Sequence, residues 1–422
     1  MAKYNTTEET KKDKASSDAT RSIIIIGALF FIFGFVTWLN ALLIPYLKIA
    51  CELTTFQSYF VTFAFYIAYV VMAPISTRTL NHFGFKKGMS VALGVMALGA
   101  LLFIPAAMSR TYLIFLLGLF VMGGGLAILQ TAVNPYVTIV GPAESAAKRI
   151  SIMGICNKLA GAAAPILIGF FLQLDKAEEL AGTTNEAALD EMALRVIPPY
   201  IGIIVVLLAL ALWVYKSSLP EVEAEDKEDA NAVQKEAKKI SDYPHAILGV
   251  ITLFIYVGVE VIAVDTIIDY GIFQGFDFET AKSFTTGTMA AMIVGYLIGI
   301  VAIPKYIKQE NALKVCAILG VVFTVGAIFT SGFLSVTFIA LLGLANSLMW
   351  PAIWPLALAD VGKLTKAVSS LLVMGIAGGA IIPLAYGGLA EVMDKQGAYW
   401  VAVPLYLFIL YYAIAGHKIR KA

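Results

Sequence analysis

Charge is the scarcest feature of this sequence. The chain has 422 residues, of which 59% are hydrophobic and only 14% are charged, whereas about 25% of the residues in an ordinary soluble domain are charged. A soluble fold of this length needs a polar surface, and 30 basic and 29 acidic residues are too few to form one. The apolar, aromatic composition also excludes a disordered or fibrous chain. The sequence therefore predicts a polytopic membrane protein.

Other sequence features are sparse, and each shortage excludes a class of function. A net charge of +1 provides no basic surface for nucleic acid. The three cysteines and three histidines lack metal-ligand spacing and indicate free thiols without a disulfide framework. The sequence has no nucleophile motif, phosphate loop or convergent acid–base cluster, so we expect neither enzymatic activity nor a cofactor. Residues 1–21 are polar and basic, which predicts a solvated tail and not a signal peptide.

Long apolar segments fill most of the chain. A membrane-spanning helix needs about 20 apolar residues, and a segment in lipid must be helical to satisfy its own backbone. Twelve segments meet this requirement, so the predicted fold is an all-α membrane protein. They lie near 22–47, 56–80, 87–108, 111–140, 150–174, 196–216, 245–272, 282–304, 312–331, 333–360, 367–391 and 397–416.

The basic residues indicate how the chain is oriented, because lysine and arginine concentrate in cytoplasmic connections. Of the 30 basic residues, 23 fall in the two tails and in alternate connections, six fall in the opposite connections, and Lys158 falls inside a span. We therefore expect a protein of the cell inner (cytoplasmic) membrane with both termini and the hydrophilic 217–243 segment in the cytoplasm.

The 217–243 segment divides the twelve spans into six and six. A Gly-x-x-x-Pro-x-x-x-Gly motif begins at Gly161 and recurs at Gly379, an offset of 218 residues. Recurrence at one offset indicates two halves with a shared fold, although close helix packing would explain one motif alone. The predicted organisation is a cytoplasmic tail (1–21), a six-helix bundle (22–216), a cytoplasmic linker (217–243), a second six-helix bundle (244–416) and a cytoplasmic tail (417–422).

Polar side chains inside the predicted spans are costly in lipid and mark candidate functional sites. Amide side chains offer a donor beside an acceptor, which suits adjacent sugar hydroxyls, and an indole offers a flat apolar wall for a sugar ring. The scarcity of charge favours a neutral substrate. Alternatively, the amides form only interhelical hydrogen bonds and the indoles only pack. The candidate sugar contacts are Asn40, Gln130, Asn134, Asn157, Asn346, Trp38, Trp350 and Trp354.

Lys158 lies in the interior of a predicted span. It is nine residues beyond Arg149, so a helix places it about 13 Å deep, too deep for its side chain to reach water easily. Glu260 lies at a similar depth and Asp265 one to two turns further out, whereas Asp269 is expected to be solvated near the outer end. We expect Lys158 to pair with Glu260 or Asp265, either as a cation-coupling element or as a purely structural ion pair.

Several segments resemble the major facilitator superfamily, and more specifically its fucose–galactose–glucose permease branch. They cover residues 33–48, 129–138 with its Asn-Pro pair, 149–158, and Tyr-Val-Gly-Val-Glu-Val at 256–261. The resemblance extends over nearly the whole chain, and the pattern is nearest to bacterial glucose/galactose transporters. It implies a major facilitator fold, and a monomeric carrier that binds glucose, galactose or mannose at mid-membrane while one half rocks against the other.

The chain departs from the fucose permeases at positions that carry their protons. Those proteins have an Asp where this chain has Ala41, and a Glu where it has Gln130, so their proton route cannot be carried over. One of their helix 5 amides is matched by Asn157, whereas Gly154 replaces the other. Their helix 8 Arg corresponds to Tyr296, which the resemblance adds to the candidate sugar contacts.

These observations predict a hexose importer coupled to a cation, with small neutral sugar and the lipid bilayer as its partners. The coupling candidates are Glu260, Asp265 and Lys158. Na⁺ is slightly favoured over H⁺, because related members of the branch use sodium. A carboxylate at Asp265 or Glu260 can hold Na⁺ with backbone oxygens, or it can bind a proton, and Lys158 can act as a built-in cation. The alternatives are a sugar uniporter or exporter, or a membrane sugar sensor.

Overall fold

The computed structural model describes residues 22–139, 146–173, 185–217, 219, 240–303, 305–361 and 364–419. Within these ranges the chain is helical and contains no strand. Twelve helical segments are long and apolar enough to cross a membrane, which confirms the twelve predicted spans. The predicted tails at 1–21 and 420–422 and most of the predicted linker at 217–243 lie outside the described residues.

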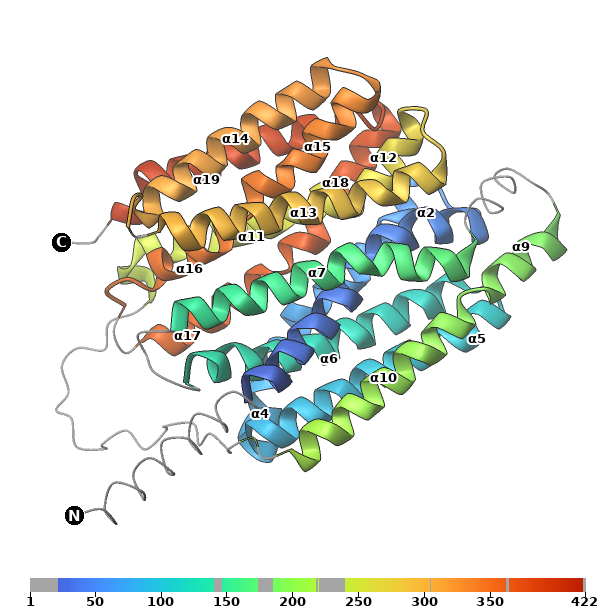
Figure 1. Ribbon diagram of the computed structural model, residues 1–422, viewed down its shortest axis with the longest axis horizontal. Helices are drawn as coiled ribbons and strands as arrows, with labels where there is room; N and C mark the ends of the chain where they lie inside the picture. Colours follow the sequence, from blue (N-terminus) through green and yellow to red (C-terminus); the bar gives the residue numbers. More distant parts are fainter. Residues whose placement is uncertain are drawn as a thin grey trace, which may run out of the picture.

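Spans 1 to 6 form the first half of the molecule (Figure 1). Span 1 comprises helical residues 22–38 and α2 (Asn40–Ala50), and span 2 begins with α3 (Thr55–Ser58). Helix α4 (Phe60–Leu101) continues span 2 and, after a kink, contains span 3, which α5 (Phe103–Met108) completes. The remaining spans are α6 (Tyr112–Ile139), α7 (Ala146–Leu172), and α9 (Glu186–Leu194) with α10 (Ile197–Lys216).

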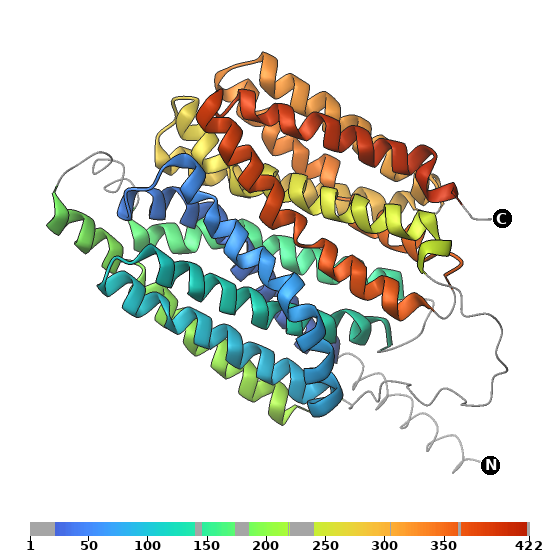
Figure 2. The same cartoon turned by 180° about the vertical axis from the view of Figure 1, so that it is seen from behind.

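Spans 7 to 12 form the second half, which lies alongside the first in both views (Figures 1 and 2). Span 7 is α11 (Pro244–Asp265), preceded by η2 (Ile240–Asp242) and continued by α12 (Ile267–Phe273). Spans 8 to 10 are α13 (Phe278–Ala302), α14 (Gln309–Phe329), and α15 (Gly332–Asn346) with α16 (Met349–Leu358). Span 11 is α17 (Thr365–Gly375) with α18 (Gly378–Val392), and span 12 is η4 (Gly397–Val401), α19 (Ala402–Ile414) and η5 (Gly416–Lys418).

Individual residues determine where some of these helices begin and where the chain reverses direction. Spans 2 and 3 reverse direction at Gly84, whose φ of 75° is accessible to glycine without strain. Asp277 begins α13 by accepting a hydrogen bond from the backbone nitrogen of Thr280 at 2.9 Å. That hydrogen bond holds the pKa of Asp277 below its usual value.

We call the side with the Lys- and Arg-rich connections the inner side, and the opposite side the outer side.

Equivalent glycines produce equivalent helix contacts in the two halves. A Cβ atom on Gly123 of α6 would overlap the backbone carbonyl of Phe65 in α4, and one on Gly343 of α15 would overlap the carbonyl of Thr288 in α13. The two glycines are 220 residues apart, close to the offset of the repeated glycine–proline motif. Spans 2 and 4 of the first half therefore approach each other in the same way as spans 8 and 10 of the second half. This repetition supports a shared fold for the two halves.

Large apolar side chains cover the outside of the helix bundle. Phe170, Leu113 and Phe329 are 78%, 74% and 74% exposed. In water such a surface would drive aggregation, whereas in a bilayer it contacts the lipid chains. The exposed apolar surface and the twelve spans together identify a multi-pass membrane protein.

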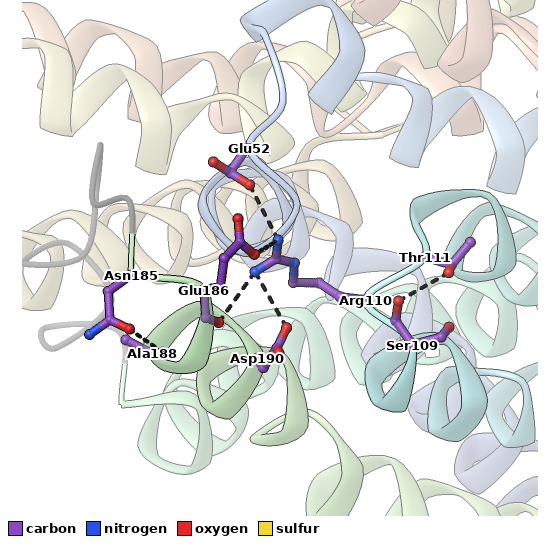
Figure 3. A network of polar contacts seen from close by, with 8 residues as sticks. All are labelled: Glu52, Ser109, Arg110, Thr111, Asn185, Glu186, Ala188 and Asp190. Atoms are coloured by element: carbon purple, nitrogen blue, oxygen red, sulfur yellow. Dashed lines mark hydrogen bonds and ion pairs between the residues drawn. The ribbon is translucent and has the colours of Figure 1, made fainter.

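One arginine joins three segments at the outer end of the first half (Figure 3). The guanidinium of Arg110, between α5 and α6, lies 3.3 Å from Glu52 and 3.4 Å from Asp190, and it also pairs with Glu186. Glu52 follows span 1, whereas Glu186 and Asp190 belong to α9. Arg110 and Glu52 both have positive φ, 46° and 54°, which is uncommon for residues other than glycine. The arginine therefore fixes how the outer connections of spans 1, 3 and 6 meet.

We expect Arg110→Gln to lower the unfolding temperature in detergent by about 2 °C, because three neighbouring carboxylates would lose their shared cation. The matched control is Arg195→Gln, since Arg195 pairs with Glu191 within a single segment and should matter less. Salt at 1 M, where the screening length is about 3 Å, should narrow the difference between Arg110→Gln and wild type. Equal losses in the two variants, or a loss that salt does not change, would contradict this account.

Candidate functional site

Two candidate residues of span 1, Trp38 and Asn40, flank Leu39, which keeps right-handed helical dihedral angles. The first helix of this span covers residues 22–38, and α2 begins at Asn40. A Cβ atom on Gly34 would overlap the backbone carbonyl of Asn157, so spans 1 and 5 are in close contact. Asn40 is 1% exposed, and neither its amide nitrogen nor its amide oxygen has a hydrogen-bond partner. Such an amide is costly to bury, which makes Asn40 a candidate for contact with a polar substrate.

Candidate residues from spans 1, 5 and 7 meet at one buried ion pair. Lys158 Nζ lies 2.8 Å from Glu260 Oε1, and the two side chains are only 6% and 9% exposed. Lys158 Nζ also lies 4.1 Å from the centre of the Trp38 ring, an attractive arrangement for a desolvated cation. Trp38 Nε1 donates a hydrogen bond to Asn157 Oδ1 at 3.2 Å. Of the two carboxylates considered from the sequence, Glu260 is therefore the partner of Lys158, and the pair joins the two halves.

Two tyrosines lie beside this ion pair. Tyr256 is one turn before Glu260 in α11, and Tyr296 comes from α13; both interact electrostatically with the Glu260 carboxylate. The Tyr296 ring packs against Gly154 of α7, where a Cβ atom would lie 3.6 Å from the ring. Tyr296 thus lies at the interface between spans 5 and 8, next to the ion pair.

The candidate residues of span 10 extend the same region. Trp350 and Trp354 stack with ring centres 5.2 Å apart, and Trp350 lies 6.4 Å from the ring of Tyr256. Asn346 is fully buried, and its Oδ1 accepts a hydrogen bond from the Tyr406 hydroxyl at 3.0 Å. Its Nδ2 has no partner. Trp350 therefore connects to the ion pair through Tyr256, while Asn346 keeps a free donor.

Gln130 and Asn134 form a second polar group, one turn apart in α6. Gln130 Nε2 donates to the hydroxyl of Tyr69 at 2.5 Å, so part of its hydrogen-bonding capacity is already used by span 2. Gln130 is buried and Asn134 half-buried. Together with Phe30 and Phe33 of span 1 they line a small hollow. This arrangement places the span 4 amides against span 1.

Asp265 stands apart from the ion pair. It is the last residue of α11, and span 7 continues through Thr266, which keeps right-handed helical dihedral angles, into α12 from Ile267. Asp265 is 0% exposed, and neither carboxylate oxygen has a hydrogen-bond partner. An ionised carboxylate in this environment would be very costly.

The expectation that Asp269 is solvated is wrong. Its side chain is 6% exposed, and Oδ1 lies 2.7 Å from Lys395 Nζ. Span 7 continues through α12 to Phe273, so Asp269 lies within the helix and below its outer end. Lys395, in the connection after α18, pairs with Asp269. This contact joins segments that are far apart in the sequence, and hydropathy does not reveal it.

Sequence reasoning missed the tyrosines that connect these groups. The Tyr69 hydroxyl accepts a hydrogen bond from Gln130, and the Tyr406 hydroxyl donates one to Asn346. Tyr256 lies beside Glu260. The spacing of four residues between Tyr256 and Glu260 was a usable signal, since it places both on one helix face. The others come from different spans, and nothing in the sequence separates them from the remaining tyrosines of the chain.

The fold and the site together define a class of protein. Twelve spans in two similar halves surround a buried polar region made by spans 1, 5, 7, 8 and 10. This is the architecture of a secondary transporter, with a polar site between two halves that move relative to each other.

Comparison with known proteins identifies the family. Residues 26–369 match the Major Facilitator Superfamily, so the chain belongs to that family of transporters. It is 33% identical to a glucose/galactose transporter of Brucella abortus, with 97% of each chain covered. It is 28% identical to the L-fucose-proton symporter of Escherichia coli, with 92% of each chain covered. The structure of the Major Facilitator Superfamily transporter FucP in the outward conformation is similar, with a TM-score of 0.71, 27% identity, and 93% and 97% of the two chains covered.

Proposed function

We propose that this protein is a monomeric carrier of the cell inner membrane that imports a neutral hexose together with a proton. Both termini and the 217–243 linker lie in the cytoplasm, and the six-helix halves 22–216 and 244–416 rock around the buried site. The observation that carries the proposal is the cluster of Trp38, Asn157, Lys158 and Glu260 between the halves. Relatives that are named glucose/galactose transporters support a hexose as the substrate.

The free hydrogen-bonding groups of the site suit a sugar. Asn40, Asn157 and Asn346 each retain at least one buried amide atom without a partner, and they come from spans 1, 5 and 10. Trp38 and Trp350 offer flat faces against which a pyranose ring can pack. A sugar hydroxyl can accept a hydrogen bond from the free Asn157 Nδ2, while Asn157 Oδ1 accepts from the Trp38 N–H. The same amide would then join the sugar to the ring that covers Lys158.

Asp265 is the proposed proton carrier. It is fully buried without a cationic partner, whereas the acids on either side of it are paired, Glu260 with Lys158 and Asp269 with Lys395. A proton is the smallest charge that allows this carboxyl to be buried. It would be taken up from the outer solution and released to the cytoplasm when the inner side opens.

A proton fits better than the sodium ion that the sequence slightly favoured. Two of the relatives are named proton symporters. Lys158 stays a fixed internal cation that keeps Glu260 neutralised throughout the cycle.

Uptake of labelled D-glucose into proteoliposomes tests the proposal. With an inward pH gradient we expect accumulation above the external concentration, and with a sodium gradient alone only equilibration. Galactose, mannose and L-fucose as unlabelled competitors define the substrate. Accumulation that follows sodium and ignores pH would replace the proton by sodium, and equilibration under both gradients would make the protein a uniporter. No saturable uptake of any of these sugars would overturn the hexose assignment.

A further inference from the structure

Two buried asparagines of the candidate sugar site have only one end of their amide in use. Asn157 in span 5 and Asn346 in span 10 are 7% and 0% exposed. The oxygen of each amide accepts a hydrogen bond from an aromatic side chain, whereas the nitrogen of each has no partner. The two residues belong to opposite halves, so the same arrangement occurs on both sides of the site.

Trp38 determines which way the Asn157 amide points. Its Nε1 donates to Asn157 Oδ1 at 3.2 Å, and an indole N–H can only donate. If the amide turned over, two N–H groups would face each other, so the oxygen lies toward Trp38 and the nitrogen away from it. The Trp38 ring is itself held in place, because a Cβ atom on Gly161 would lie 2.5 Å from its Cδ1 and Lys158 Nζ lies over its face.

Tyr406 of span 12 holds the Asn346 amide in the same sense. Its hydroxyl donates to Asn346 Oδ1 at 3.0 Å, and both side chains are completely buried. The Tyr406 ring packs against Gly320 of span 9, where a Cβ atom would overlap it. This close packing fixes the position of the hydroxyl and leaves Asn346 Nδ2 as the unused end of the amide.

Span 8 brings the segments that carry the two amides together. The Tyr296 ring lies against Gly154, one turn before the asparagine of span 5. A Cβ atom on the neighbouring Gly295 would overlap the hydroxyl of Ser347, which follows Asn346. Consecutive residues of one helix therefore contact both segments, and the two free amide nitrogens belong to one region at the boundary between the halves.

Two other amides of the site are not restricted in this way. Asn40 has a partner at neither its oxygen nor its nitrogen, so it can donate or accept. Gln130 is held in the opposite sense, since its Nε2 donates to the Tyr69 hydroxyl at 2.5 Å. The combination of an occupied oxygen and a free nitrogen thus distinguishes Asn157 and Asn346 from both of them.

We propose that two positioning residues, Trp38 and Tyr406, turn the amides of spans 5 and 10 so that each amide donates a hydrogen bond to one hydroxyl of the sugar. This deepens the proposed function and rests on it. Buried N–H groups without a partner are rare and costly in proteins, and a sugar that accepts from both removes this cost. The site therefore recognises two hydroxyls through their oxygen lone pairs, one from each half.

Analogues of D-glucose with one hydroxyl replaced test the direction of these bonds. Hydrogen in its place removes both donor and acceptor, whereas fluorine keeps a weak acceptor and cannot donate. We measure how each analogue inhibits counterflow of labelled D-glucose in proteoliposomes, an exchange of sugar that needs no ion gradient and so does not depend on the coupling ion. At two positions the deoxy analogue should bind about tenfold more weakly than glucose, and the fluoro analogue only about threefold.

Tyr406→Phe tests the positioning role. Without the phenolic hydroxyl the Asn346 amide can turn over and offer its oxygen, so at one of the two positions the fluoro and deoxy analogues should bind equally. The other position, which Trp38 controls, should keep the advantage of fluorine over hydrogen. A purely structural loss would weaken all analogues in proportion and leave these ratios unchanged.

Tyr412→Phe is the matched control, because Tyr412 is also fully buried in α19 and its hydroxyl donates to the backbone carbonyl of His245. It should keep the wild-type ratios at every position, and wild-type ratios in Tyr406→Phe would overturn the role of Tyr406. If wild type exchanges D-glucose but the fluoro and deoxy analogues bind alike at every position, this inference fails while the proposed function stands. If wild type exchanges no hexose, the proposed function itself fails.

Discussion

Replacing Lys158 with methionine should lower D-glucose uptake at least ~100-fold. Methionine keeps the length of the side chain but leaves Glu260 as an uncompensated charge at a site where both side chains are less than a tenth exposed. Breaking one partner of such a pair typically costs about 3–5 kcal/mol. The change also removes the cation from the face of Trp38, which would free the indole that holds Asn157.

A double variant separates charge balance from function. Lys158→Met combined with Glu260→Gln removes both charges, so its unfolding temperature should recover most of the loss seen with Lys158→Met alone. Uptake should recover less, because the pair also positions Trp38. Lys395→Met is the comparison for loss of a half-buried, ion-paired lysine, since Lys395 pairs with Asp269 away from the candidate sugar contacts. Near-normal uptake by Lys158→Met, or a double variant less stable than the single one, would refute the assigned role.

Asp265→Asn should uncouple transport from the pH gradient. Asparagine is nearly isosteric with the protonated acid and cannot release a proton, so the variant resembles a carrier that is permanently loaded. We expect counterflow of labelled D-glucose to persist while accumulation under an inward pH gradient falls to simple equilibration. The reason is that the unpartnered Asp265 carboxyl is the group assigned to carry the proton.

A charge-matched control is available in the same half. Asp277→Asn also removes one carboxylate, but Asp277 begins α13 at the outer surface, and asparagine is an equally good residue at the start of a helix. Its accumulation should equal that of wild type. If Asp265→Asn still concentrates sugar under a pH gradient, the proton must bind elsewhere and Glu260 becomes the carboxyl to examine.

The spans and the nature of the buried residues could be predicted because both depend on local composition. Twenty apolar residues define a helix in lipid whatever surrounds it, and a lysine about 13 Å deep requires a partner wherever the helices pack. Depth alone narrowed that partner to Glu260 or Asp265. The repeated glycines likewise indicated two related halves before any contact was known.

The partners of the remaining polar residues could not be predicted, because they depend on which helix faces meet. Asp269 was expected to be solvated, but the structure pairs it with Lys395, which comes from the connection after α18. Tyr59 and Tyr66 share one face of span 2, but only the packing of their rings against Gly379 and Gly387 of span 11 shows that this face meets the opposite half. The choice between Glu260 and Asp265 as the partner of Lys158 was a question of packing, and hydropathy carries no information on it.

The central claim is that sugar and proton move together, and a pH electrode tests it most directly. D-Glucose added to lightly buffered, energy-depleted cells that express the wild-type protein should make the medium more alkaline, in proportion to sugar uptake. Asp265→Asn should exchange sugar without that change, and Asp277→Asn should reproduce it. Glucose uptake by the wild-type protein without any alkalinisation of the medium would contradict the account.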